Sequence, residues 1–165
     1  MNNIFLIGFM GSGKTTIANR LNRKYGVDVI DMDKTIENNE GMKISEIFEN
    51  KGEDYFRRLE TELILELKKK HNTVVSCGGG AALKPENVEA MKSSGKIIML
   101  EASPETILER VKNNHSRPLL EGNKNIEYIA ELMSKRVDKY MAAADMVINV
   151  DNKGIEDICK EIMDK

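Results

Sequence analysis

Short apolar runs alternate along the chain with longer segments in which apolar residues recur at helical spacing. Five nearly continuous apolar runs are expected to form strands, at 3–7, 27–31, 73–77, 96–101 and 145–150. Such runs are typical of parallel strands that are buried on both faces of a sheet. The alternation of strands with helices therefore predicts an α/β fold in three layers, with helices covering both faces of a parallel sheet.

Two of the intervening segments carry complete helical stripes. One runs through Ile155, Ile158, Cys159, Ile162 and Met163, and the other lies within 126–141. Ser103-Pro104-Glu105 has the signals of a helix start, namely an N-cap, a proline at the first position and an early acid. The segment 113–123 has loop composition and predicts a mobile lid at about 112–124. We find no repeat or linker, so 1–165 is interpreted as a single domain.

The segment from Gly8 to Thr15, GFMGSGKT, matches the phosphate-loop pattern G-x-x-x-x-G-K-[ST]. Glycines let backbone N–H groups surround phosphate oxygens, and the following helix N-terminus adds partial positive charge. Lys14 can reach the β- and γ-phosphates, and the Thr15 hydroxyl can ligate Mg²⁺. The alternative is a plain glycine turn carrying an exposed lysine. The position of the loop, directly after a strand and before a helix, favours a nucleoside triphosphate site.

Other features narrow the class of phosphate-loop protein. A small GTPase would carry N-K-x-D, but Asn152-Lys153-Gly154 is followed by Ile155. A motor ATPase would end a strand in an acid, whereas the strand at 73–77 ends in Gly78-Gly79-Gly80. Three glycines let a ligand approach bare backbone, although they are also compatible with a tight strand-to-helix turn. The combination favours a small-molecule kinase.

Acids and arginines supply the candidate chemistry. Asp31 and Asp33 end the second expected strand, and in an extended chain both carboxylates face one side. One could hold a metal-bound water while the other contacts a substrate hydroxyl; alternatively they are a loop acid and a helix N-cap. Arg57 has Glu60 one helical turn away, which could fix its guanidinium. Arg117 lies in the expected lid, where it could reach the transferring phosphate.

Composition excludes several other classes. The chain has 165 residues, a net charge of −2 and a pI near 5.8, which argues against a dedicated nucleic-acid binder. No apolar run approaches 18 residues and no secretory signal is present, so we expect no membrane association. Cys77 and Cys159 are far apart in the sequence, which is typical of a reduced, cytoplasmic protein.

Five motifs in order resemble the shikimate kinase family over essentially the whole chain. They are GFMGSGKT at 8–15, D-x-D at 31–33, FRRLE at 56–60, GGG at 78–80 and RPLL at 117–120. The resemblance implies a phosphate-loop fold of the nucleoside monophosphate kinase group, with a five-stranded parallel sheet in the order 2-3-1-4-5. It also implies transfer of the γ-phosphoryl group of ATP to the 3-hydroxyl of shikimate by a monomeric enzyme.

The resemblance assigns roles on the acceptor side, at about 32–60 and beyond. Asp33 would orient or deprotonate the acceptor hydroxyl. Arg57 and Arg136 would bind the shikimate carboxylate, beside the backbone of Gly78, Gly79 and Gly80. The helix stripe alone leaves open whether Arg136 or its neighbour Lys135 faces the pocket.

On the nucleotide side the resemblance implies that Lys14 and Arg117 stabilise the developing charge. Thr15 would ligate Mg²⁺ directly and Asp31 through water, while Arg110 and Lys153 would flank the adenine. The nucleotide-binding residues implied in this way are Gly11, Ser12, Gly13, Lys14, Thr15, Thr16, Arg110, Arg117 and Lys153.

Two alternatives come from other readings of the same motifs. A related kinase could act on gluconate or a nucleoside monophosphate, but a nucleotide acceptor needs aromatic residues to stack its base. Phe48, Tyr55 and Phe56 are the aromatic residues of the acceptor region. A catalytically silent nucleotide-binding protein would be expected to lose Asp33, Arg57 or Arg117, and all three are present.

Overall fold

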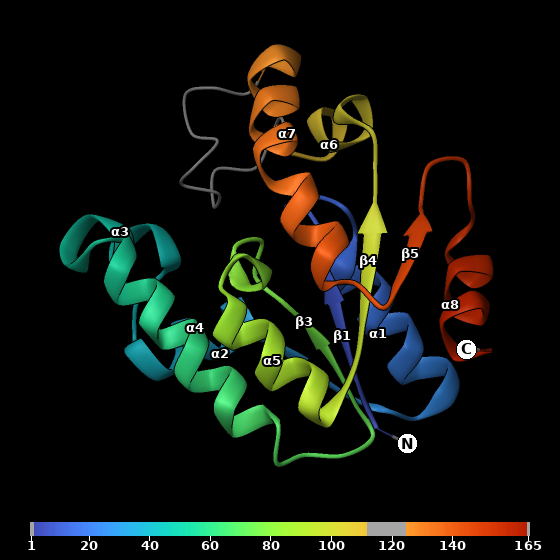
Figure 1. Cartoon of the computed structure of the whole chain (residues 1–165), viewed down its shortest axis with the longest axis horizontal. Helices are drawn as coiled ribbons and strands as arrows, with labels where there is room; N and C mark the ends of the chain where they lie inside the picture. Colours follow the sequence, from blue (N-terminus) through green and yellow to red (C-terminus); the bar gives the residue numbers. More distant parts are fainter. Residues whose placement is uncertain (1, 112–124, 165) are drawn as a thin grey trace.

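The computed structural model describes residues 2–111 and 125–164 (Figure 1). The segment predicted to form the lid, at about 112–124, therefore lies outside the described residues, and so does Arg117. The described residues form a five-stranded parallel sheet with helices on both faces, as the sequence pattern predicts.

All neighbouring strands of the sheet run parallel, in the order β2-β3-β1-β4-β5. This order confirms the fold that the resemblance implied. The strands lie close to the five expected apolar runs, at Asn3–Ile7 (β1), Asp28–Asp31 (β2), Thr73–Ser76 (β3), Gly95–Glu101 (β4) and Met146–Asn149 (β5). The central strands β1 and β3 are buried along their whole length, because helices cover both faces of the sheet.

Helices fill the two outer layers. In Figure 1, α1 (Lys14–Tyr25) lies behind the sheet, and α5 (Pro85–Ser94) and α7 (Ile126–Ala143) lie in front of it. The last helix, α8 (Ile155–Met163), packs against α1. Most of the predicted apolar stripes face the core, but Ile155 and Met141 are exposed, since each stripe is wider than the surface its helix buries.

The helix α6 (Pro104–Val111) begins as its sequence predicts. Pro104 is the first helical residue, and the Ser103 hydroxyl accepts a hydrogen bond from the Thr106 N–H at 3.2 Å. Asp151, which follows β5, accepts hydrogen bonds from the Ser103 N–H and the Thr106 hydroxyl. The start of α6 is thereby tied to the carboxyl end of the sheet.

The expected acceptor region, 32–60, folds into three helices beside the sheet: α2 (Met32–Glu40), α3 (Ile44–Lys51) and α4 (Glu53–Leu67). The prediction that Asp31 and Asp33 face one side of an extended chain is wrong. Asp31 caps α2 by accepting a hydrogen bond from the Lys34 N–H at 3.2 Å, so Asp33 is already helical. A short 3₁₀ turn, η1 (Ala81–Leu83), follows the three glycines.

Candidate active site

The phosphate loop joins β1 to α1 at the carboxyl edge of the sheet, where ligands of open α/β folds bind. Gly8, Gly11 and Gly13 all have positive φ, at 144°, 83° and 100°. A Cβ on Gly8 would also lie 2.5 Å from the carbonyl oxygen of Leu100 in β4. Glycine is required at position 8 because both the backbone conformation and the close strand exclude a side chain.

Lys14 is the cation of this loop and is buried. Its Nζ donates hydrogen bonds to the carbonyl oxygens of Gly8, at 2.9 Å, and Phe9, at 3.1 Å. The ammonium therefore lies against the loop itself, at the N-terminal end of α1. Phosphate oxygens that enter the loop can take the place of these carbonyl acceptors.

Three side-chain oxygen atoms that could ligate a metal ion lie together beside the start of α1. The Thr15 hydroxyl donates to Asp31 Oδ2 at 3.1 Å and lies 3.0 Å from the Ser76 hydroxyl. Hydroxyl and carboxylate oxygens are the ligands that Mg²⁺ prefers, and Mg²⁺ usually takes few protein ligands beside phosphates and water. The donor set fits that ion. Within 2–111 and 125–164, no group of three or more His, Cys, Asp or Glu side chains is arranged to hold a metal.

A cavity of about 450 Å³ opens on the outer side of the phosphate loop. Arg110 of α6 lines it and donates to the Gly11 carbonyl oxygen at 3.0 Å. Lys153 lines the same cavity and forms an ion pair with Glu161 at 3.1 Å. The structure thus brings together the predicted nucleotide-binding residues that it describes, and all of them except Ser12 line this cavity. The lining residues are Gly11, Gly13, Lys14, Thr15, Thr16, Arg110 and Lys153.

A second, smaller cavity of about 180 Å³ lies on the other side of Lys14. Asp31, Asp33 and Gly79 line it together with Lys14. Asp33 Oδ1 is 3.0 Å from the position that a Cβ on Gly78 would occupy. Asp33 therefore lies between the phosphate loop and the glycine run, although by a helical path rather than the expected extended one.

Arg57 and Glu60 form the ion pair that their spacing predicts. Arg57 Nη1 donates to Glu60 Oε1 at 2.8 Å, and its Nε and Nη2 atoms reach Glu53 Oε2 at 3.3 and 3.2 Å. Glu60 is 1% exposed, and its second oxygen, Oε2, has no hydrogen-bond partner among the described residues. Burial raises the pKa of Glu60 above its ordinary value, and the nearby charge of Arg57 acts in the opposite direction.

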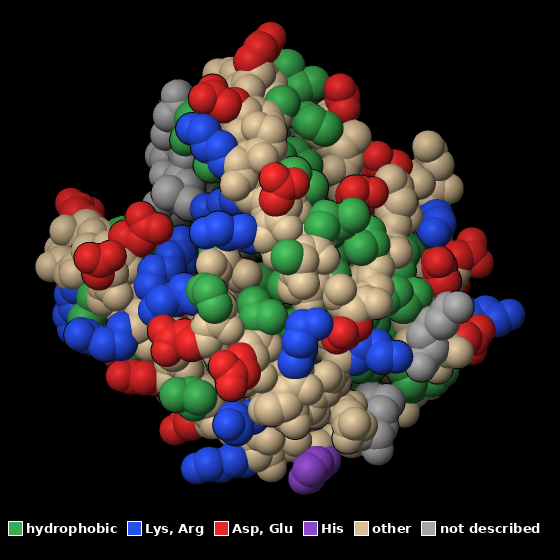
Figure 2. Space-filling model, viewed as in Figure 1, with side chains coloured by type: hydrophobic (Ala, Val, Ile, Leu, Met, Phe, Trp, Pro, Cys, Tyr) green, Lys and Arg blue, Asp and Glu red, His purple; other side chains and the backbone are tan. Residues whose placement is uncertain are grey.

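Arg136 reaches the glycine run from α7. It is 7% exposed, whereas the Lys135 side chain is 67% exposed, so the arginine is the residue that faces inward. Its Nη1 has no hydrogen-bond partner among the described residues and lies 3.5 Å from the position of a Cβ on Gly79. Figure 2 shows Lys and Arg side chains gathered in the hollow between α4 and α7.

The glycine run 78–80 is needed for space rather than for backbone conformation. None of the three glycines has positive φ. A Cβ on Gly78 would lie 2.5 Å from Glu60 Oε2, and a Cβ on Gly80 would collide with the Arg57 guanidinium. The run therefore admits four charged side chains against bare backbone: Asp33, Arg57, Glu60 and Arg136. Gly80 also begins the turn into η1, which is the strand-to-helix turn that the sequence offered as an alternative. The approach of a ligand to this backbone stays a prediction.

Sequence reasoning missed three residues of the site. Ser76 contacts Thr15, and its position directly before Cys77 and the glycine run is the signal that could have found it. Glu60 was assigned only to Arg57, yet its Oε2 atom is also buried beside Gly78 with no partner among the described residues. Tyr140 donates a hydrogen bond to the Gly79 carbonyl oxygen, and nothing in the helix stripe distinguishes it from a core residue.

Cys77, directly before the glycine run, also lines the cavity of about 180 Å³ but is buried. That burial strongly raises the pKa of its thiol, which opposes a role as a nucleophile. No helix in the described part of the chain is long and apolar enough to cross a bilayer.

Comparison with known proteins gives one consistent family. The family model described as shikimate kinase matches residues 10–165. Shikimate kinases of Persephonella marina and a Sulfurihydrogenibium species are 45% and 44% identical, over 99% and 100% of this chain and 98% of each relative. The solved structure of shikimate kinase from Acinetobacter baumannii in complex with shikimate has a TM-score of 0.93 at 32% identity, covering 99% of this chain and 91% of that one.

Proposed function

Because the chain belongs to the shikimate kinase family, we propose that it uses ATP to phosphorylate the 3-hydroxyl of shikimate, with the residues described above. One observation carries the assignment of the acceptor site. Arg136 Nη1 and Glu60 Oε2 are both buried beside the glycine run without a partner among the described residues. A buried donor and a buried acceptor left open are costly, so the pocket is complementary to a ligand that supplies an anion and hydroxyl groups.

Shikimate has that chemistry, since it is a small acid with three hydroxyl groups. Arg57 and Arg136 bind its carboxylate, because planar guanidinium groups match the two carboxylate oxygens. Glu60 Oε2 accepts a hydrogen bond from a hydroxyl group, and the backbone of Gly78, Gly79 and Gly80 lines the pocket. These contacts place the reacting hydroxyl beside Asp33.

Asp33 is the residue that acts on the acceptor. Its carboxylate accepts the proton of the 3-hydroxyl as that oxygen forms a bond to the γ-phosphorus of ATP. The bond between the γ-phosphorus and the bridging oxygen breaks, and ADP leaves with that electron pair. Phosphoryl transfer depends mainly on positioning and charge stabilisation, and both substrates are held within one enclosed edge of the sheet.

Lys14 supplies the positive charge that stabilises the transferring phosphoryl group. Its Nζ exchanges the carbonyl oxygens of Gly8 and Phe9 for phosphate oxygens. Arg117 is assigned to the same task, although its position lies outside the described residues. The loop N–H groups of Gly11, Ser12, Gly13, Thr15 and Thr16 bind phosphate oxygens, and Arg110 and Lys153 flank the adenine in the outer cavity.

Thr15 and Asp31 would hold Mg²⁺, Thr15 directly and Asp31 through water, with the Ser76 hydroxyl beside them. When bound, this ion neutralises charge on the β- and γ-phosphate oxygens. A monomeric state and a cytoplasmic location stay predictions, and the burial of both cysteines is compatible with them.

The aromatic residues of the acceptor region argue against a nucleotide acceptor. Phe48 and Phe56 pack against each other with ring centroids 5.2 Å apart, and Phe56 is buried in the core. The Tyr55 hydroxyl donates to Glu40 at 2.7 Å. All three rings are thus used for packing or internal contacts, so none of the three offers a free face on which a base could stack.

The proposal is tested by measuring ADP release with Mg-ATP and each of five additions: shikimate, gluconate, AMP, CMP or buffer. We expect strong turnover with shikimate alone and little ATP hydrolysis without an acceptor. Turnover on gluconate or a nucleotide in preference to shikimate would assign the pocket to a related kinase. ATP binding without turnover on any acceptor would indicate a catalytically silent binding protein.

A further inference from the structure

We infer that Phe9 and Tyr140 position the Arg136 guanidinium for the acceptor carboxylate, an inference that rests on the role proposed above for Arg136. The two arginines of the pocket are held in different ways. Arg57 makes ion pairs with Glu53 and Glu60, but among the described residues no carboxylate lies within ion-pair distance of Arg136. The contacts of Arg136 within the described part of the chain are therefore with the neutral side chains of Phe9 and Tyr140.

Tyr140 is the first of these neighbours. It lies one helical turn after Arg136 on α7, is 2% exposed, and its hydroxyl donates to the Gly79 carbonyl oxygen. Burial raises the pKa of Tyr140, and the charge of Arg136 and a side-chain hydrogen bond with it act in the opposite direction. The phenol therefore joins α7 to the glycine run at the place where the Arg136 Nη1 faces Gly79.

Phe9 is the second neighbour and belongs to the phosphate loop. It is 3% exposed, and the Arg136 Cζ atom lies 5.7 Å from the centroid of its ring. A guanidinium at that separation is attracted to an aromatic face, more strongly where water is excluded. Phe9 therefore links the loop that binds phosphate to the arginine that binds the acceptor.

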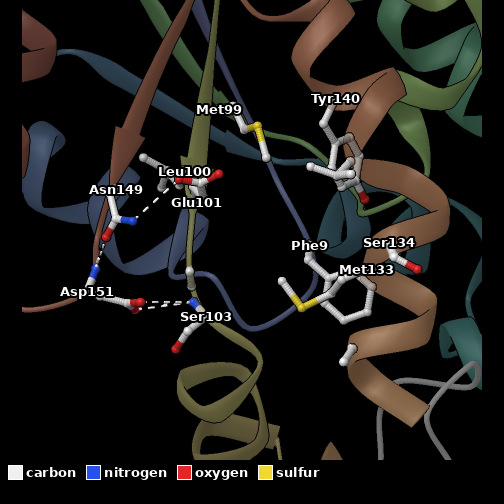
Figure 3. A pocket seen from close by; sticks show the side chains of 13 residues that line it. Phe9, Met99, Leu100, Glu101, Ser103, Met133, Ser134, Tyr140, Asn149 and Asp151 are labelled. Atoms are coloured by element: carbon white, nitrogen blue, oxygen red, sulfur yellow. Dashed lines mark hydrogen bonds between the residues drawn. The ribbon is translucent and has the colours of Figure 1, made fainter. Parts of the chain in front are cut away.

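A cavity next to these two rings explains why they are needed. It has a volume of about 380 Å³ and is lined by Phe9 of the phosphate loop and by Met133, Val137 and Tyr140 of α7. In Figure 3 the Phe9 ring lies beside Met133, and Tyr140 lies further along α7 on the same side. With a smaller side chain at position 9, the space vacated by the ring would join this cavity and no packed neighbour would fill it. The Arg136 side chain would then sample more conformations, and shikimate binding would have to restrict it to one of them at a cost in entropy.

The test measures the dissociation constant of shikimate by calorimetry for Tyr140→Phe, Phe9→Leu and Arg136→Met, and for each ring variant combined with Arg136→Met. We expect each single ring variant to weaken shikimate binding roughly fivefold to tenfold. In the Arg136→Met background the same changes should matter less than about twofold, because neighbours in one network are not additive. For Tyr140→Phe, KM for shikimate should rise while kcat and KM for ATP stay within about twofold.

Two variants serve as controls. Tyr25→Phe removes a hydroxyl at the C-terminal end of α1. Met133→Leu changes another residue that lines the cavity and leaves the Phe9 ring in place. Both should bind shikimate as the wild type does. Phe9→Met is measured alongside as a second ringless variant, in case leucine at position 9 unfolds the loop, and thermal unfolding reports the folded fraction of every variant.

The outcomes separate the inference from the proposed function. Unchanged shikimate binding in Arg136→Met would overturn the proposed role of Arg136 and the inference with it. Weakened binding in Arg136→Met, with ring variants that are neutral or fully additive, would overturn the inference alone. Equal weakening of ATP and shikimate binding by Phe9→Leu and Phe9→Met would show that Phe9 acts on the phosphate loop instead, and would also overturn it.

Discussion

The two halves of the site treat their charges in opposite ways. On the nucleotide side each cation that the structure describes has a partner within the protein: Lys14 binds loop carbonyls, Arg110 binds the Gly11 carbonyl and Lys153 pairs with Glu161. On the acceptor side, Arg136 and Glu60 are buried and each keeps one atom without a partner among the described residues. Under the proposed assignment, ATP would exchange existing hydrogen bonds, whereas the acceptor would complete missing ones.

The difference indicates which step each half controls. Exchange of one hydrogen bond for another is nearly neutral in free energy, so the nucleotide-side cations contribute chiefly when charge develops during transfer. Completing a buried, pre-oriented set of groups contributes directly to binding. Substitutions on the acceptor side should thus appear mainly in affinity for shikimate. Asp33, which we propose contacts the reacting oxygen, is the exception.

That exception should give the largest effect. Asp33→Asn keeps the size of the side chain but cannot accept the hydroxyl proton, so we expect kcat to fall by about 10²–10⁴ with KM for ATP nearly unchanged. Steady-state kinetics with shikimate measures this. Asp28→Asn, at the exposed start of β2, is the matched control. Full activity in Asp33→Asn would remove the carboxylate from the mechanism.

Lys14→Met tests the nucleotide side. Loss of one preorganised positive donor should lower kcat/KM for ATP by about 10²–10³, because charge on the transferring group is no longer stabilised. The dissociation constant of shikimate should change less than about threefold. Lys24→Met, an exposed lysine on the same helix paired with Glu156, should behave as the wild type. Comparable losses in ATP and shikimate binding would contradict the separation of the two halves.

A pair of glycine substitutions compares the two halves sterically. Gly80→Ala places a Cβ against the Arg57 guanidinium, which must leave Glu60, so KM for shikimate should rise on the order of tenfold. In Gly154→Ala, beside the nucleotide cavity, the nearest atom to the new Cβ is 3.8 Å away, so kinetics should not change. Gly80→Ala should also lower the thermal unfolding temperature, because buried Glu60 loses its ion-pair partner, whereas Gly154→Ala should not. Wild-type KM in Gly80→Ala would show that the position of Arg57 is unimportant.

The smallest effect is a dependence on pH. Burial raises the pKa of Glu60 above its ordinary value of 4.5, so this group is protonated in a window just above pH 4.5 where an exposed glutamate is ionised. Protonation removes the charge that holds Arg57. We expect kcat/KM for shikimate to fall a few-fold as pH drops through this window, and Glu60→Gln to abolish that inflection. Glu53→Gln, which changes the exposed partner of Arg57, should retain it.

The same titration affects stability with a definite sign. Because the folded-state pKa is raised, ionised Glu60 destabilises the folded protein fully above the window and not at all below pH 4.5. The free energy of unfolding of Glu60→Gln, relative to wild type, should therefore increase as pH rises across the window. A difference that stays constant with pH would contradict the burial argument.

Local chemistry in the sequence was enough to predict much of this molecule. The apolar runs predicted five strands, the signals at Ser103 and Pro104 predicted the start of α6, and GFMGSGKT predicted the loop before α1. The spacing of Arg57 and Glu60 predicted their ion pair. Each of these depends on residues within a few positions of one another. The extended geometry assumed for Asp31 and Asp33 failed because Asp31 caps a helix, in line with the N-cap that the sequence offered as the alternative.

Tertiary structure decided everything that joins distant segments. Sheet order brings β3, the phosphate loop and α7 together, and only then does Ser76 contact Thr15 and Arg136 face Gly79 rather than solvent. Two further features depend on side chains far apart in the sequence: the burial of Glu60 Oε2 without a partner among the described residues, and the approach of Arg136 to the Phe9 ring. Sequence spacing fixes which residues share a turn, but burial and charge depend on what the folded chain packs against them.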